Sequence, residues 1–450
     1  MRKKIILPLL LSCLFLIPFY SWCQHTEIYG RVVDKETDEV IPFCTISLKD
    51  ASIGTCSNSR GEFIFHYPDS LKGSDLKVCC IGYKTKVIQL NTKASAEIAT
   101  IYLESELYEI PEIQVGPNQP TATDIIKHVI RNMHKNYPRS PYYMEGFLRD
   151  KCFNLMDNTN TRLTEAAVEI RKKEFGGETN ADRVKVIEIR NSYNYSKLGS
   201  LWKEKLTRAF WGYSTDNPLY NVLQYKDFTD SKELKELLRN DLYSTSISGY
   251  TMFDGKPVVI IDIKEEFVKY LFLKTPAKNL YDLIKLYIDT ENYAMLKTEK
   301  YTIAKLPKEQ LPKDFKMYFK NDSIGTFAVK QYEKIDGQYY LKYAGYFGRV
   351  HDQPDVAEMG KTLYFNESEL LINKLITNRK EFDRIKHRDL LEKDVPLWDM
   401  KYVYDPSFWK NYNILIDKPL NPMVQKDLEK EVPLYDQFID AGVKNSTNQK

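Results

Sequence analysis

Histidine and acidic side chains most often bind metals or move protons, and their spacing in this chain fits no known centre. His128 and His134 lie six residues apart on or just past one predicted helix, so they point to different faces. The acidic run Asp34–Glu39 places carboxylates at alternate positions, but it lacks the glycine and the distal glutamate of a calcium loop. We expect solvated side chains at both places and predict no metal or cofactor site.

Patterns for nucleophilic and acid–base catalysis do not occur either. Glu165 and Glu169 would share one face of a strand about 13 Å apart, beyond the ~5–9.5 Å of glycosidase carboxylate pairs. The chain has no Gly-x-Ser-x-Gly elbow. Gly360-Lys361-Thr362 lacks the earlier glycine of a phosphate-binding loop. We expect the two glutamates to face solvent, and the sequence predicts no catalytic residue.

Two aromatic groups could contact a ligand. One is Phe-Trp-Gly-Tyr at 210–213, and the other is Phe408-Trp409. Such rings can stack on a sugar or line an apolar groove. Packing in a core or between domains is their commoner use, and we expect it here.

The N-terminus has the order of a secretory signal. A basic start at 2–4 precedes an apolar stretch at 5–20, and Ser21 and Cys23 supply small residues before a cut at Gln24. The apolar stretch is shorter than the roughly 20 residues of a membrane span. We predict cleavage after Cys23 and a periplasmic or outer-membrane-associated location. An uncleaved anchor and a lipid on Cys23 are the alternatives. No later apolar stretch is long enough to span a membrane.

The cysteines that remain after this cleavage are odd in number, so at least one is unpaired or pairs between chains. A disulfide in the first hundred residues, for example Cys44 with Cys80, and burial as small apolar side chains are both open. No Cys-x-x-Cys pair occurs, so neither a zinc knuckle nor a thioredoxin-like site is expected. The remaining cysteines are Cys44, Cys56, Cys79, Cys80 and Cys152.

Composition indicates an ordinary globular protein with much sheet. Of 450 residues, 43% are hydrophobic and 28% charged. Aromatic residues reach 13%, mostly tyrosine, which suits sheets with one wet face. The net charge of +3 is too balanced for a nucleic-acid-binding surface.

Residues 26–104 alternate apolar and polar side chains in short runs divided by Gly, Asp, Asn and Ser. This pattern predicts a β-sandwich. The segment carries a set of motifs: Gly30–Asp34, Pro42, Cys44–Leu48, Gly54-Thr55, Gly61-Glu62-Phe63 and Ile81-Gly82-Tyr83. With them it resembles the carboxypeptidase-D regulatory-like domain, a transthyretin-like seven-stranded sandwich found in many exported bacterial envelope proteins. Cys44 departs from the more usual alanine, and 57–60 lack the usual aspartate of the turn before Gly61.

This resemblance does not imply peptidase activity. In metallocarboxypeptidases the sandwich accompanies a separate catalytic domain, whose zinc site opens with His-x-x-Glu. None of the histidines here has a glutamate three residues later: His25, His66, His128, His134, His351 and His387. We therefore lean towards a protein without enzymatic activity.

After a linker, Thr121 caps a predicted helix at 122–136, whose apolar side chains recur at spacings of three and four. The following chain is mostly β, with a second helix at 231–239. Two hairpins are marked by Asp254-Gly255 and Asp336-Gly337, since Asp-Gly between alternating runs is a strong hairpin signal. A third is expected across 289–292. The predicted organisation is a signal peptide at 1–23, a β-sandwich at 26–104, a linker at 105–120, an α+β antiparallel-sheet domain at 121–440 and a polar tail at 441–450.

The second part resembles the uncharacterised region that follows such sandwiches in exported envelope proteins, on segments 140–149, 286–293 and 404–409. Its hairpins are also similar to the open half-barrel of lipoprotein carriers. The leading hypothesis is an envelope accessory or binding protein, with an envelope protein or a lipid or glycan as partner. The alternatives are a hydrolase with an unrecognised site in 140–440, a half-barrel lipid carrier and a purely structural protein.

Overall fold

In the computed structural model, the described residues are 25–49, 53–58, 60–71, 73–89, 99–106, 108, 120–154, 157–175, 182–195, 218–224, 231–266, 281–303, 324–350, 364–377, 385, 390–391, 396–400, 402–414 and 422–447. The predicted signal peptide, most of the predicted linker, the 210–213 aromatic group and Gly360–Thr362 lie outside them.

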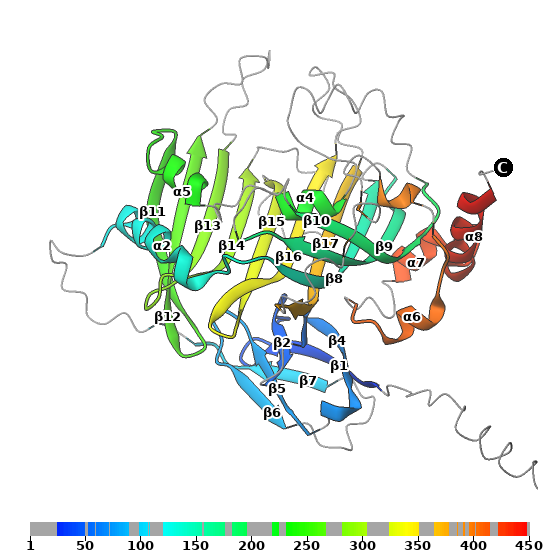
Figure 1. The fold of residues 1–450 in the computed structure, drawn as a ribbon, viewed down its shortest axis with the longest axis horizontal. Helices are drawn as coiled ribbons and strands as arrows, with labels where there is room; N and C mark the ends of the chain where they lie inside the picture. Colours follow the sequence, from blue (N-terminus) through cyan, green and yellow to red (C-terminus); the bar gives the residue numbers. More distant parts are fainter. Residues whose placement is uncertain are drawn as a thin grey trace, which may run out of the picture.

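The N-terminal region is the predicted sandwich (Figure 1). One sheet has the order β4-β1-β7 and the other β3-β2-β5-β6. Residues just past the predicted boundary remain attached, because the N–H of Glu106 donates to the carbonyl of Gly82 at 2.8 Å. The strands are β1 His25–Asp34, β2 Thr45–Leu48, β3 Gly54–Cys56, β4 Glu62–Pro68, β5 Asp75–Cys79, β6 Lys86–Gln89 and β7 Ala99–Leu103.

Gly61 has a conformation that other residues rarely adopt. Its φ is +72°, and a Cβ there would lie 2.6 Å from the carbonyl oxygen of Val32. Val32 donates its N–H to the carbonyl of Gly61 at 2.7 Å, which fixes this close approach. The expected glycine turn is therefore confirmed.

A large antiparallel sheet follows, with the order β10-β9-β8-β17-β16-β15-β14-β13-β12-β11. Its first strand in the chain, β8, pairs with its last, β17, in the interior of the sheet. The sheet is open, with β10 and β11 at the ends of this order. The strands are β8 Tyr142–Asn154, β9 Thr159–Lys172, β10 Arg183–Asn191, β11 Tyr243–Phe253, β12 Lys256–Glu266, β13 Tyr281–Asp289, β14 Met295–Ile303, β15 Ile324–Ile335, β16 Gln338–Val350 and β17 Tyr364–Ile376.

The predicted hairpins are present because their turn residues accept positive φ. Asp254 and Gly255 have φ of 52° and 73°, and Asp336 and Gly337 have φ of 50° and 87°. A two-residue turn with both φ values positive matches the right-handed twist of paired strands. The local sequence thus sets the register of β11 with β12 and of β15 with β16.

Helices cover one face of the large sheet. Helix α2 (Ala122–Asn136) starts with the predicted cap, where the hydroxyl of Thr121 accepts the N–H of Asp124 and the Asp124 carboxylate accepts the N–H of Thr121. Its side chains pack with α5 (Ser231–Leu237) on β12–β14. Helix α4 (Pro218–Gln224) packs on β16 and β17. We call this side the helix face (Figure 1).

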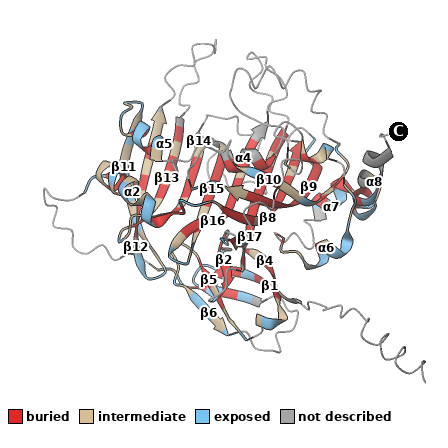
Figure 2. Ribbon diagram, in the orientation of Figure 1, coloured by how far each residue is buried: buried red, intermediate tan, exposed pale blue. Residues whose placement is uncertain are grey.

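The sandwich packs on the opposite side, which we call the sandwich face. Phe43 stacks on Tyr343 of β16 with ring centroids 5.0 Å apart. The backbone of His66 exchanges two hydrogen bonds with the amide of Asn413, at 2.7 and 3.1 Å. At another point the N–H of Gly82 donates to the carbonyl of Met252 at 2.8 Å. These separate contacts join the sandwich to the large sheet. Buried residues are concentrated in the strands of that sheet, whereas β11 and β6 carry more exposed ones (Figure 2).

The C-terminal elements pack at the β9–β10 end of the sheet. They are η7 Leu397–Asp399, α6 Pro406–Asn411, α7 Pro422–Leu428 and α8 Leu434–Thr447. Pro422 opens α7, a position in which the fixed φ of proline suits the first turn of a helix. Helix α8 continues through Thr447, so much of the expected polar tail is helical. Among the described residues, no helix combines the length and apolar character needed to cross a membrane.

Candidate functional site

A band of polar side chains crosses the helix face beside its apolar part. Alternate residues of a strand share a face, so the apolar series that ends at Leu148 continues with Asp150 on β8. In the same way, the apolar side chains that alternate along β9 end at Ala166, and Thr164 and Arg162 follow on the same face. Strand pairing extends the row across β17, β15, β14 and β13. This polar band consists of Asp150, Arg162, Thr164, Ser368, Asn366, Thr326, Lys330, Lys300 and Asp282.

Arg162 and Asp150 form a fully buried ion pair in this polar band. Both side chains are 0% exposed. The Nη2 of Arg162 donates to Oδ2 of Asp150 at 2.8 Å, and the hydroxyl of Ser368 donates to Oδ1 at 2.6 Å. The guanidinium carbon lies 3.5 Å from the ring centroid of Trp398. The charge of Arg162 is therefore compensated by a carboxylate and an aromatic face.

Several atoms of the polar band have no hydrogen-bond partner among the residues that the structure describes. They are Nε and Nη1 of Arg162, Oγ1 of Thr164 and Thr326, and Oδ1 of Asn366. A buried polar atom left unsatisfied costs about 1–3 kcal/mol, more for a charged group. Such atoms in a native protein normally bind water or a ligand. The polar band thus offers both donors and acceptors that the described residues do not use.

The polar band also carries two lysines near α4. Lys300 pairs with Asp282 at 2.6 Å, and both side chains are almost fully buried. Lys330 donates to the carbonyl of Leu223 at 3.4 Å. These lysines and Val222 border a hollow of about 10 Å³, about the space of one water molecule. In the described part of the chain, α4 therefore closes tightly on this section of the helix face.

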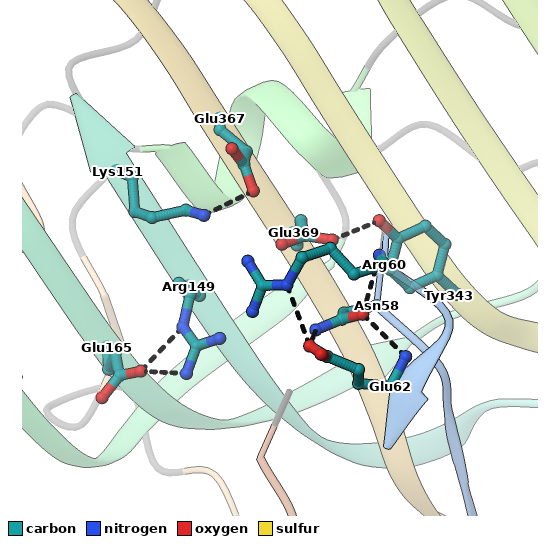
Figure 3. A network of polar contacts seen from close by, with 9 residues as sticks. All are labelled: Asn58, Arg60, Glu62, Arg149, Lys151, Glu165, Tyr343, Glu367 and Glu369. Atoms are coloured by element: carbon teal, nitrogen blue, oxygen red, sulfur yellow. Dashed lines mark hydrogen bonds and ion pairs between the residues drawn. The ribbon is translucent and has the colours of Figure 1, made fainter. Parts of the chain in front are cut away.

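The sandwich face carries a second polar network, whose members satisfy one another (Figure 3). Arg149 donates from Nε and Nη2 to Oε1 of Glu165, at 2.8 and 2.6 Å. Arg190 pairs with the other oxygen, Oε2, at 2.5 Å. The hydroxyl of Tyr343 donates to Glu369 at 2.7 Å. Further contacts are Lys151 with Glu367 and, on the sandwich, Arg60 and Asn58 with Glu62.

Two carboxyls of the sandwich face have opposite pKa shifts. Burial disfavours the charge of Glu165, but Arg190 and Arg149 more than offset it and hold its pKa below the usual range. For Glu369, burial and the neighbouring Glu367 raise the pKa to about 7, against the effects of Lys151, Tyr343 and Arg149. Glu165 is thus a fixed anion, whereas Glu369 takes up a proton near neutral pH.

The expectation that Glu165 and Glu169 face solvent is wrong. Their exposures are 2% and 5%. The two side chains point to the side of the sheet on which the aromatic cluster of Phe147, Phe43 and Trp409 lies, so they are covered. Burial of Glu165 is possible because two arginines compensate its charge.

Other residues singled out in the sequence are brought to no common site. His134 is exposed, while His128 is half-buried and stacks on Tyr293 at 4.7 Å, so it is less solvated than expected. Oδ1 of Asp34 accepts the N–H groups of Glu36 and Thr37, so the acidic loop closes on its own backbone. Among the described residues, no cluster of His, Cys, Asp and Glu could hold a metal ion.

The aromatic pair Phe408-Trp409 packs inside the protein, as predicted. Trp409 is 5% exposed, lies edge-on to Phe147 and has the guanidinium of Arg190 4.5 Å from its ring centroid.

Sequence reasoning missed Arg162 and Asp150. Each lies at the end of an alternating apolar series, at Ala166–Ile170 and at Tyr142–Leu148, on the side that the fold buries. A charge in the buried register of a strand was the available signal.

Comparison with solved structures gives distant likenesses. An outer membrane lipoprotein-sorting protein domain, so described provisionally, from Vibrio parahaemolyticus has 8% identity and a TM-score of 0.26, covering 58% of this chain and 96% of that one. A DUF1329 family protein from Desulfovibrio piger has 12% identity and a TM-score of 0.26, and the match covers 61% of this chain and 100% of that one. A LolA superfamily protein from Nitrosomonas europaea has 8% identity and a TM-score of 0.23, and the match covers 61% of this chain and 99% of that one. Scores of this size do not establish a shared fold. No curated protein matches the chain.

The N-terminal region matches a family model. The matched residues are 28–115, which include most of β1 and all of β2 to β7. The observed topology, two small sheets around one core, agrees with the resemblance that its motifs carry. The N-terminal part of this chain is thus a CarboxypepD_reg-like domain, joined to a larger open antiparallel sheet.

Proposed function

We propose that this chain is an exported, non-enzymatic binding protein of the cell envelope, which holds a polar ligand at the polar band of its helix face. The observation that carries the proposal is Arg162, a fully buried guanidinium with two nitrogen atoms that lack partners in the described part of the chain. The CarboxypepD_reg-like domain supports the sheet from the opposite side.

The chemistry of the polar band favours a ligand with acceptor oxygens and at least one donor. Nε and Nη1 of Arg162 can donate, Thr164 and Thr326 can do either, and Oδ1 of Asn366 can accept. Asp150 keeps the charge of Arg162 balanced, so the ligand need not carry a full negative charge. Each bond formed would remove part of the cost of burying these groups.

The apolar part of the same face favours a second candidate, a carrier of acyl chains. The apolar clusters that surround Val129 of α2 and Val222 of α4 lie on this side of the sheet. Because α4 closes tightly, such a chain would have to displace the helix. Native mass spectrometry of gently purified protein separates the two candidates, since an acyl chain and a small polar compound differ in mass and composition.

The test of the proposal compares two conservative variants. Arg162→Lys keeps the charge but replaces the planar guanidinium and its five donors by a compact ammonium with three, whereas Arg149→Lys makes the same change on the sandwich face. Native mass spectra and melting curves with added inorganic phosphate, citrate or glucose are recorded for all three proteins. We expect a bound species or a stabilising shift that Arg162→Lys loses and Arg149→Lys keeps. Wild-type protein that binds nothing, or variants that bind equally, would contradict the proposal.

A further inference from the structure

We propose that Cys44 and Cys80 form a disulfide bond, which locks the turn that joins the sandwich to the large sheet. The described cysteines are free thiols in this structure. The inference stands on strand register and does not depend on the proposed ligand.

The register of β2 with β5 places the two residues opposite each other. Thr45 pairs with Cys79, so the residues one step beyond, Cys44 and Cys80, face each other across the end of this antiparallel pair. Opposed residues in such a pair have Cα atoms roughly 4.5–5.5 Å apart. Disulfides span Cα distances of about 4.4–6.8 Å, so the backbone need not move.

The two thiols also influence each other, because the Cys44 side chain lowers the pKa of Cys80. The Cys44 thiol donates to the carbonyl of Ile41 at 3.4 Å, and burial raises its pKa. Cys44 has no exposed surface, whereas Cys80 is half-buried. Cys80 is thus the more nucleophilic and the more accessible of the two.

These properties define the order of the chemistry. The thiolate of Cys80 attacks an external disulfide, either oxidised glutathione or the disulfide of an envelope thiol oxidase, and one of its sulfurs leaves as a thiol. Cys44 then loses its proton and attacks the sulfur of Cys80, which releases the second sulfur as a thiol. Two protein thiols are oxidised, and the external disulfide is reduced.

The bond would hold a segment that carries interdomain contacts. Cys80 begins the turn through Tyr83, whose N–H donates to the carbonyl of Cys80 at 3.1 Å. Within this turn, Gly82 donates its N–H to Met252 of β11, and Ile81 packs against the apolar cluster under α2. Oxidation would link this turn to the start of β2 and so restrain how the sandwich sits on the sheet.

Full-length protein from residue 24 onward provides the test. It is incubated with oxidised glutathione, unfolded, alkylated with iodoacetamide and digested without reductant. We expect one cross-linked peptide pair, with Cys44 and Cys80, and alkylation of Cys56, Cys79 and Cys152. The matched control Cys79→Ser should give the same pair, and Cys80→Ser should give none.

A second measurement tests the proposal without the Cys80→Ser variant, so that poor folding of this variant does not affect the result. Reduction by dithiothreitol should lower the Tm of the oxidised wild type and of Cys79→Ser by about 5 °C or more. Full alkylation of Cys44 and Cys80 after oxidation, a stable glutathione adduct on Cys80, or a different cysteine pair would overturn the proposal.

Discussion

The two faces of the large sheet use buried charge in different ways. On the sandwich face, both oxygens of Glu165 are bound, by Arg149 and by Arg190. On the helix face, Arg162 uses one nitrogen for Asp150 and leaves two without a partner in the described ranges. The first arrangement meets the requirements of a buried charge and so serves stability, whereas the second leaves hydrogen-bonding capacity that a bound molecule can use.

Removing a cation from the sandwich face should give the largest loss of stability. Arg149→Met leaves Glu165 buried with one arginine, and breaking such a pair costs about 3–5 kcal/mol. Urea unfolding monitored by circular dichroism measures the loss. A loss under about 1 kcal/mol would show that Arg149 does not stabilise this face.

Glu369 should make stability depend on pH. Its pKa is raised from 4.5 to about 7 in the folded protein, so ionisation favours the unfolded chain. The contribution of the protonated carboxyl is complete below about pH 4.5 and is lost as the pH rises to about 7. Glu369→Gln should therefore gain about 1–3 kcal/mol over wild type between pH 5 and 8.

Parallel pH profiles for the two proteins would contradict this assignment. Tyr343→Phe is the matched control, because it leaves the carboxyl in place and removes one hydrogen bond that favours its charged form. In this variant the loss of stability should begin at the same pH and be somewhat larger.

The buried pair of the helix face should be dispensable for folding. Replacing Asp150 by Leu and Arg162 by Met in one protein removes both charges, and such exchanges are neutral or stabilising by about 1–4 kcal/mol. The unpaired atoms of Arg162 make a net gain the expected result. A loss above about 2 kcal/mol in urea unfolding would mean that this pair stabilises the fold, as the pair on the other face does.

The smallest effect is expected at the rim of the sandwich face. Lys77 of the sandwich pairs with Asp254 at 2.9 Å, with both side chains partly exposed. Asp254→Asn keeps a residue that tolerates the φ of 52° but loses the ion pair. We expect a loss of about 0–1 kcal/mol, smaller in high salt. A larger loss, unaffected by salt, would mean that this ion pair is one of the main contacts that hold the sandwich on the large sheet.

Local signals made much of the fold predictable, whereas the site depends on distant contacts. The Thr121 cap and the Asp-Gly turns act within a few residues, so the sequence reveals them. The pairing of β8 with β17 joins residues over 200 positions apart, and it places Ser368 on Asp150. Glu165 was assigned to solvent because Arg190 and the covering sandwich cannot be seen from its own strand.

A high-resolution crystal structure of protein purified from the cell envelope tests the central claim most directly, through the electron density around Arg162. We predict density for a bound polar compound within hydrogen-bonding distance of Nε or Nη1. Density for ordered water alone, or for side chains of the protein that fully satisfy this guanidinium, would contradict the account.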